Sequence, residues 1–165
     1  MHSELEKTRY RIYIETSIVS YLVARQSRDV IIAGHQLATQ VFWDMLTEFE
    51  VYLSDMVLQE VSKGDPEQAQ LRLQALTGFP VLEIDDEARN IADQLIAGKA
   101  VPKNCPEDAL HIAVAAVNGM DIMVTWNFKH INNPSTKAKM RQIIENQGYA
   151  FPEICSPDEL TGDQT

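Results

Sequence analysis

The sequence predicts an α/β protein with a mostly parallel central sheet and helices on its faces. Short apolar runs of strand length recur along the chain, and amphipathic helical segments alternate with them. No repeat or low-complexity linker divides the 165 residues. We therefore expect a single domain over residues 1–165, with flexible polar ends at residues 1–9 and 161–165.

Five apolar runs are predicted to be strands. Each is a few residues long and is bounded by polar or turn-forming residues. The predicted strands are residues 10–14, 51–53, 80–84, 122–124 and 150–155. The last run contains Pro152, which cannot donate a hydrogen bond to a neighbouring strand, so we expect an edge strand there.

Helices are predicted between these strands, and capping residues mark where they begin. Thr16-Ser17 offers an N-cap for a helix at residues 18–24, and Asp85 or Asp86 offers one for a helix that ends at Gly98. A long helix is expected at residues 30–49. Its helical spacing indicates core positions at Ile31, Leu37, Val41, Met45 and Leu46.

Composition and charge exclude some functions and leave others open. The formal net charge of −10 argues against a general nucleic-acid coat or a binder of anionic membranes. A nuclease stays open, because a bound divalent cation and local basic loops can offset acid at a site. The first ten residues lack the apolar core of a signal peptide, and no apolar run has the length of a membrane helix. We therefore expect a cytoplasmic protein with no membrane partner, in which Cys105 and Cys155 are reduced thiols.

A helix–strand unit at residues 106–130 indicates where a functional site lies. Pro106 and Glu107 mark the start of the helix, and residues 122–124 form the strand that follows it. Because a crossover helix runs antiparallel to the strands, the start of this helix and the end of the strand lie at the same edge. Open α/β sheets bind ligands at that edge, outside the carboxyl ends of the strands. We expect Asp108 and Asn127 to point there.

Four polar residues are expected to converge at this edge and to hold a divalent metal. Glu15 ends the first predicted strand, and Glu60 lies in the helix after the second. Asp108 lies at the start of the helix–strand unit and Asn127 follows its strand. Carboxylate and amide oxygens are ligands that suit Mg²⁺ or Mn²⁺. Each residue also has a simpler interpretation. Glu60 can be a solvated surface acid, Asp108 a helix-start acid and Asn127 a turn former.

Four segments in order give the chain a resemblance to a known family. They are IYIETSIVSYL, LSDMVLQE before Lys63, PEDALHIA and VTWNFKHI. The chain resembles PIN-domain proteins of the kind found as VapC-type toxins of toxin–antitoxin pairs. This resemblance implies a three-layer α/β/α fold and Mg²⁺- or Mn²⁺-dependent cleavage of phosphodiester bonds, usually in RNA. It also implies that the family's metal-binding positions are Glu15, Glu60, Asp108 and Asn127.

Two of these positions depart from the family pattern. The family usually has Asp where this chain has Glu15, and the extra methylene moves the carboxylate outward by about 1.5 Å, a large shift beside a Mg–O bond of about 2.0–2.1 Å. The fourth position is often Asp and is Asn127 here, so the site loses one negative charge. A second metal ion would then bind more weakly.

Further residues are expected to support the site. Thr16 and Ser17 are most simply helix caps, although the family pattern also suggests a hydroxyl near the metal. Thr125 either holds a site carboxylate by a hydrogen bond or ends a strand. His111 shares a helix face with Asp108 and supports the site or is simply a buried, hydrogen-bonded histidine.

Basic residues near the same edge are candidates for RNA contacts, with ordinary surface charge as the alternative. These candidates are Arg25, Arg28, Lys129 and His130. Trp126 either stacks on a base or packs over the end of the sheet.

The leading hypothesis is therefore a metal-dependent endoribonuclease, the toxin of a type II toxin–antitoxin pair, with RNA as substrate and an antitoxin protein as partner. The resemblance is also compatible with a homodimer. The alternative is a PIN-like binding or regulatory module with weak or no catalysis, which Glu15, Asn127 and the acidic net charge favour.

Overall fold

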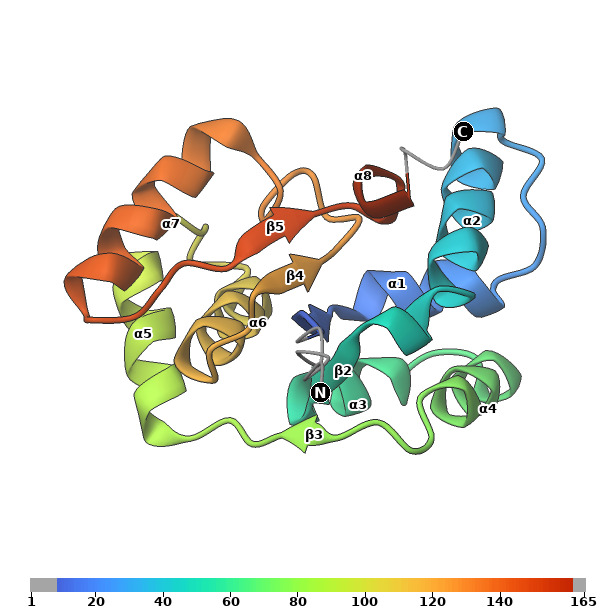
Figure 1. Ribbon diagram of the computed structural model, residues 1–165, viewed down its shortest axis with the longest axis horizontal. Coiled ribbons are helices and arrows are strands. Elements are labelled where there is room, and N and C mark those ends of the chain that lie inside the picture. Colours follow the sequence, from blue (N-terminus) through green and yellow to red (C-terminus); the bar gives the residue numbers. More distant parts are fainter. Residues whose placement is uncertain (1–8, 162–165) are drawn as a thin grey trace, which may run out of the picture.

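The computed structural model describes residues 9–161. Flexible ends were expected at residues 1–9 and 161–165, and most of these lie outside the described residues, whereas Thr161 ends the last helix. One five-stranded sheet forms the centre, in the order β3-β2-β1-β4-β5, and every neighbouring pair is parallel (Figure 1). The strands are β1 (Arg11–Ile14), β2 (Glu50–Ser54), β3 (Val81–Leu82), β4 (Ile122–Val124) and β5 (Glu153–Cys155). The five predicted strands and the edge position of the last are confirmed.

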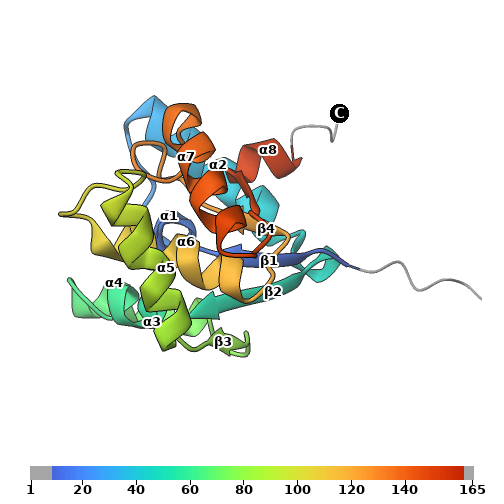
Figure 2. The same ribbon diagram turned by 90° about the vertical axis from the view of Figure 1, so that its left-hand side faces the viewer.

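Helices connect the strands and cover both faces of the sheet, which confirms the three-layer α/β/α fold class. They are α1 (Thr16–Val23), α2 (Val30–Trp43), α3 (Asp55–Val61), α4 (Pro66–Ala75), α5 (Asp86–Ala97), α6 (Pro106–Val117), α7 (Pro134–Asn146) and α8 (Pro157–Thr161). A short 3₁₀ helix at Leu46–Glu48 follows α2. In Figure 2 the helices α5, α6 and α7 lie in front of the strands.

The alternation of side chains along β1 explains why the core has two halves. Tyr13 belongs to a cluster with buried residues of α3, α5, α6 and α7 on one face of the sheet. Its neighbours Ile12 and Ile14 point to the opposite face, where they pack with Ile18 of α1 and Phe42 of α2. Because β1 is the middle strand, it is buried on both faces, as a central parallel strand requires.

One capping prediction needs correction, and a second helix has a serine in its N-cap position that does not cap it. The helix α1 begins at Thr16, with Glu15 in the N-cap position, so Thr16 and Ser17 lie inside its first turn instead of capping it. Ser54 does occupy the N-cap position of α3, but its hydroxyl bonds to the Tyr13 hydroxyl at 2.8 Å and caps no backbone group. In both cases the side chain forms a polar contact with a distant element and does not cap the helix, although the local sequence favours a cap.

The predicted core face of the second helix was wrong. Helix α2 ends at Trp43, and Ile31 and Leu37 are 71% and 63% exposed. The buried face instead carries Gln36, Thr39 and Phe42. Gln36 hydrogen-bonds the backbone of the loop before the helix, and Thr39 accepts the indole N–H of Trp126 at 2.8 Å. These polar contacts fix the rotation of a helix that is apolar on more than one side.

Within residues 9–161, none of the helices has the length and apolar character that crossing a membrane requires. Both cysteines are free: Cys155 is buried, and Cys105 is half-buried at the start of α6.

Candidate functional site

The strand order places a topological switch point between β1 and β4. From β1 the chain adds β2 and β3 on one side, and β4 and β5 on the other. Glu15 directly follows β1, and its backbone N–H bonds to the carbonyl of Val124 at 3.1 Å. Glu15 therefore lies where an open parallel sheet forms its ligand-binding crevice.

Two hydroxyl groups hold the Glu15 carboxylate, which is 7% exposed. Thr125 donates to Oε1 at 2.7 Å, and Ser17 donates to the same oxygen. The Ser17 hydroxyl also accepts the backbone N–H of Trp126 at 2.9 Å, which ties the start of α1 to the end of β4. Both hydrogen bonds reach one oxygen, so the carboxylate has a fixed orientation.

A buried histidine links Glu60 to the middle strand. Nε2 of His111 is hydrogen-bonded to Oε1 of Glu60, and Nδ1 lies 2.5 Å from the Tyr13 hydroxyl. The Tyr13 hydroxyl continues the chain to Ser54, and Thr16 donates to Oε1 of Glu60 at 2.8 Å. The side chain of Glu60 is thus positioned from α1 and α6 at once, and is more than a solvated surface acid.

The charges around His111 set its protonation. Burial disfavours the imidazolium, but the hydrogen bond to Glu60 and the charges of Glu15, Glu60 and Asp108 outweigh it, so the pKa of His111 is raised. For Glu60, burial opposes ionisation, yet the contacts with His111 and Thr16 and the charge of Lys63 leave its pKa lowered. Burial, followed by the negative charges of Glu15 and Glu60, holds the pKa of the Tyr13 hydroxyl well above its usual value. All three carboxylates therefore act electrostatically on one buried imidazole.

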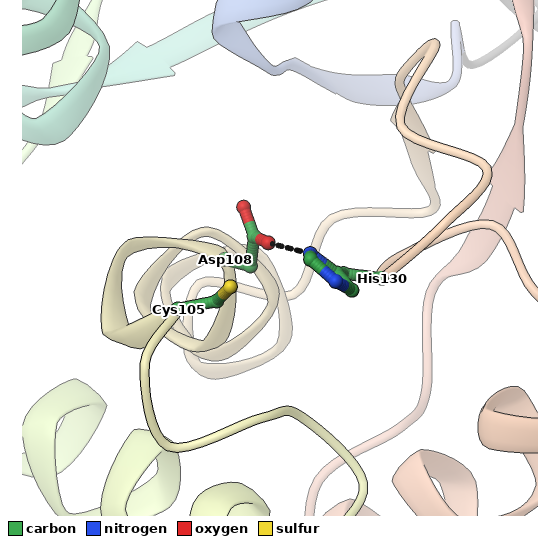
Figure 3. A group of neighbouring side chains, drawn as sticks. All are labelled: Cys105, Asp108 and His130. Carbon is green, nitrogen blue, oxygen red and sulfur yellow. Dashed lines mark hydrogen bonds and ion pairs between the residues drawn. The ribbon is translucent and has the colours of Figure 1, made fainter.

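Asp108 stands in the first turn of α6, in line with the predicted start of that helix. Its Oδ2 lies 3.0 Å from Nδ1 of His130, which comes from the loop after β4 (Figure 3). Asp108 and Glu60 both line an open hollow of about 310 Å³. We call this the acidic hollow; its lining residues are Glu60, Lys63, Asn104, Cys105, Glu107 and Asp108.

Asn127 organises the loop after β4. Its Oδ1 accepts the backbone N–H of His130 at 3.0 Å, and its own backbone N–H donates to the Thr125 hydroxyl at 3.0 Å. This is the geometry of a turn former, the simpler of the two interpretations of this residue. A ligand role for Asn127 stays a prediction.

Comparison with known proteins assigns the family. The family model described as "PIN domain" matches residues 12–133, which include all four predicted ligand positions. The chain belongs to the PIN domain family. PIN domains are generally nucleases that use divalent metals. No curated protein sequence matches the chain.

The fold of this PIN domain also resembles a solved structure, the crystal structure of VapBC2 from Rickettsia felis bound to a DNA fragment from their promoter. The TM-score is 0.53 at 21% identity, and the likeness covers 73% of this chain and 92% of the other. At that identity the likeness concerns the fold.

Two of the four predicted RNA contacts lie beside the site of the PIN domain. Lys129 and His130 line a second hollow, of about 510 Å³, together with Lys99, Lys103, Thr136 and the apolar residues Ile96, Ala97, Ala100, Val101 and Pro102. We call it the lysine hollow. The exposed Arg25 and Arg28 belong instead to the loop at the far end of α1, about 12 Å of helix away from Glu15. Trp126 is buried and stacked on His35, so its packing interpretation holds.

Several residues around the candidate site were not predicted as such. Tyr13 has the sequence features of an ordinary strand residue, and its hydroxyl reaches His111 because α6 packs on that face of the sheet. Lys63 lies just past the end of α3, where its backbone N–H donates to the carbonyl of Glu60 at 3.3 Å, and its position three residues after Glu60 could have been noticed. Cys105 was assigned a reduced thiol with no role, but it lies three residues before Asp108 at the start of the same helix.

The carboxylates of this PIN domain fit a hydrated divalent ion. Among residues 9–161, no hydrogen bond engages Oε2 of Glu15, Oε2 of Glu60 or Oδ1 of Asp108, so each acid offers one unpaired hard oxygen. The three acids do not gather within 4.8 Å of one another, as a compact cage would require. Mg²⁺ keeps several waters in most protein sites, and these can bridge that spacing.

Proposed function

We propose that this PIN domain is a metal-dependent endoribonuclease that hydrolyses RNA phosphodiester bonds. The observation that carries the proposal is the set of three unpaired carboxylate oxygens, from Glu15, Glu60 and Asp108, around buried His111 at the switch point of the sheet. Glu15, Glu60 and Asp108 would hold Mg²⁺ or Mn²⁺. The bound ion supplies an activated water and stabilises charge on the phosphate.

The protein's own groups fix the orientation of these acids. Thr125 and Ser17 occupy one oxygen of Glu15 and leave the other for the ion. Thr16 and His111 do the same for Glu60. Because the raised pKa of His111 favours the imidazolium, this ring offsets part of the negative charge that gathers before any cation binds. In this scheme Asn127 is a positioning residue, since it fixes the backbone of His130.

The lysine hollow supports RNA as the substrate. Lys99, Lys103 and Lys129 gather at one place on a chain whose net charge is −10, and His130 connects that place to Asp108. Phosphate contacts of this kind position a strand without reading its sequence. We place Arg25 and Arg28 outside the reacting centre, as contacts to a more distant part of the RNA.

A toxin of a type II pair needs an antitoxin, and α2 offers a surface for one. Val30, Ile31, Leu37 and Val41 of this helix are exposed. Exposed apolar patches of this kind often mark protein–protein contacts. The similar fold of VapBC2, whose structure includes promoter DNA, supports the proposal that this chain also acts with a second protein. In the proposal the antitoxin covers α2 in the cytoplasm, where Cys105 and Cys155 stay reduced. The purified chain alone could instead form a stable dimer. If Leu37→Glu dissociates that dimer, the exposed face of α2 serves self-association and not antitoxin binding.

Cleavage of RNA in the presence of Mn²⁺ tests the proposal. The purified chain should cleave single-stranded RNA, and Asp108→Asn should abolish cleavage because the ion loses a charged ligand. The matched control is Asp86→Asn, since Asp86 is fully exposed and pairs only with Arg89 on the surface. Equal activity of Asp108→Asn and the unmodified chain would overturn the proposal.

The alternative is a PIN domain that binds RNA or a partner without cleaving. Asn127 favours it, because an amide stands where the family often has a carboxylate and its oxygen is already engaged by His130. A chain that binds Mn²⁺ and RNA yet leaves the RNA intact would establish this second function.

A further inference from the structure

Three side chains at the start of α6 form a compact group that the nuclease site does not use as a whole. Cys105, Asp108 and His130 each offer one ligand atom, and these atoms lie within 4.8 Å of one another. Within the described part of the chain, this is the one group of three metal-ligating side chains so close together. Figure 3 shows the Cys105 sulfur and the Asp108 carboxylate rising from the same helix start, with the His130 ring facing them from the next loop.

The geometry suits a four-coordinate ion. Zn²⁺ binds thiolate at about 2.3 Å and imidazole or carboxylate at about 2.0–2.2 Å, so its tetrahedral donors stand about 3.5 Å apart. Asp108 and His130 already stand at 3.0 Å. Cys105 is half-buried, makes no capping bond, and donates only a long hydrogen bond of 3.7 Å to Oδ1 of its neighbour Asn104, so a side-chain rotation can bring its sulfur closer to Asp108 and His130. A helix N-terminus also stabilises the thiolate that the ion needs.

The donor chemistry separates this group from the proposed nuclease site. A thiolate, an imidazole and a carboxylate select Zn²⁺, whereas Mg²⁺ prefers oxygen ligands alone. The acidic hollow, which Cys105 and Asp108 both line, gives an ion a way in from solvent and leaves the fourth position for water. Its acids, Glu60, Glu107 and Asp108, outnumber Lys63, so the hollow attracts cations.

We propose that Cys105, Asp108 and His130 form a Zn²⁺ site that competes with the nuclease metal for Asp108. Zn²⁺ bound there takes Asp108 away from Glu15 and Glu60, and thereby inhibits the enzyme. The binding half of this inference is independent of the proposed function, and the inhibition half rests on it.

Co²⁺ titration under reducing, anaerobic conditions tests the binding half. A thiolate-to-cobalt charge-transfer band should appear in the near ultraviolet, and zinc should abolish it by competition. Cys105→Ser should remove the band, and His130→Ala should lower Co²⁺ affinity by about tenfold or more. Serine is a favoured N-cap residue, so Cys105→Ser keeps the start of α6 intact. The matched control Cys155→Ser should retain the band.

The absence of a thiolate band in the unmodified chain would overturn the site, as would a band that survives Cys105→Ser or an affinity that His130→Ala leaves unchanged. Glu60→Gln separates the two proposals. It removes a ligand of the nuclease metal only, so the cobalt band should persist.

Inhibition is measured on Mn²⁺-supported RNA cleavage. The zinc concentration that halves activity should rise about tenfold or more in Cys105→Ser relative to Cys155→Ser. Equal zinc sensitivity of the two variants would overturn the inhibition half. A chain that shows the cobalt band but cleaves no RNA would leave the zinc site standing and remove the nuclease.

Discussion

The Thr125 hydroxyl donates to the buried carboxylate of Glu15 at 2.7 Å, and this bond joins the carboxyl ends of the two strands at the switch point. The same hydroxyl accepts the backbone N–H of Asn127. One side chain thus orients the first acid of the proposed site and the loop that carries His130.

Replacing Thr125 by valine should weaken both metal binding and stability. Thr125→Val keeps the shape but leaves the N–H of Asn127 without a partner and leaves Oε1 of Glu15 with the Ser17 hydroxyl alone, which costs about 1–3 kcal/mol of unfolding free energy. We expect Mn²⁺ affinity to fall by about tenfold or more. Calorimetric titration and urea unfolding measure the two effects. Thr125→Ser, which keeps the hydroxyl, should retain most of the Mn²⁺ affinity and most of the stability. Unchanged Mn²⁺ affinity in Thr125→Val would contradict the role assigned to Thr125.

The Glu60–His111 pair should make stability depend on pH in a defined window. The pKa of Glu60 is lowered from 4.5 in the fold, so its contribution is complete above 4.5 and is lost as pH falls through the folded value. The pKa of His111 is raised from 6.5, so its contribution is complete below 6.5 and is lost as pH rises through the folded value.

The stability difference between the unmodified chain and Glu60→Gln should therefore be largest between pH 4.5 and 6.5 and should shrink on both sides. Urea unfolding in metal-free buffer over that range measures it. A difference that keeps growing above pH 6.5 would show that the pair is not ionic.

Two glycines in helical surroundings should respond to alanine in opposite ways. A Cβ at Gly98 would lie 2.6 Å from Cδ1 of Ile143 on α7 and 3.2 Å from the backbone oxygen of Gln94, so the end of the Ile143 side chain must shift and Gly98→Ala should destabilise by up to about 1 kcal/mol. Gly34 lies within α2 and has no atom within 4 Å of its Cβ position. Gly34→Ala should stabilise by about 0.5–1 kcal/mol. Thermal unfolding of both variants decides the comparison, and equal effects would contradict the packing of α7 on α5.

The lysine hollow should contribute to RNA affinity through charge. In an Asp108→Asn background, which prevents cleavage, Lys103→Ala or Lys129→Ala should weaken binding of single-stranded RNA at low salt. Each should also reduce the slope of log affinity against log salt concentration by about 0.7. Fluorescence anisotropy over a salt series gives both quantities. Lys139→Ala, an exposed lysine on α7 outside the hollow, should leave the slope unchanged.

The sequence was sufficient for the order of elements and for the edge at which Glu15 and Asp108 stand. Strand-length apolar runs and caps such as Asp85, which accepts the N–H of Ala88, are local signals. The rotation of α2 was not predictable in this way, because contacts of Gln36 and Thr39 with remote groups decide it. The link from Tyr13 to His111 likewise depends on how α6 packs on the sheet, and the link from Asp108 to His130 on the geometry of the loop after β4, and residue spacing contains neither.

The wide spacing of the site along the chain has a consequence for synthesis. Glu15 receives one of its two side-chain hydrogen bonds from a residue 110 positions later, and β1 pairs with β4 only once both have left the ribosome. The contact is non-local, so folding must close a long loop before this contact can form. A chain interrupted before residue 122 has no assembled site. During translation the proposed site therefore stays unassembled in each new copy until the central strands are complete.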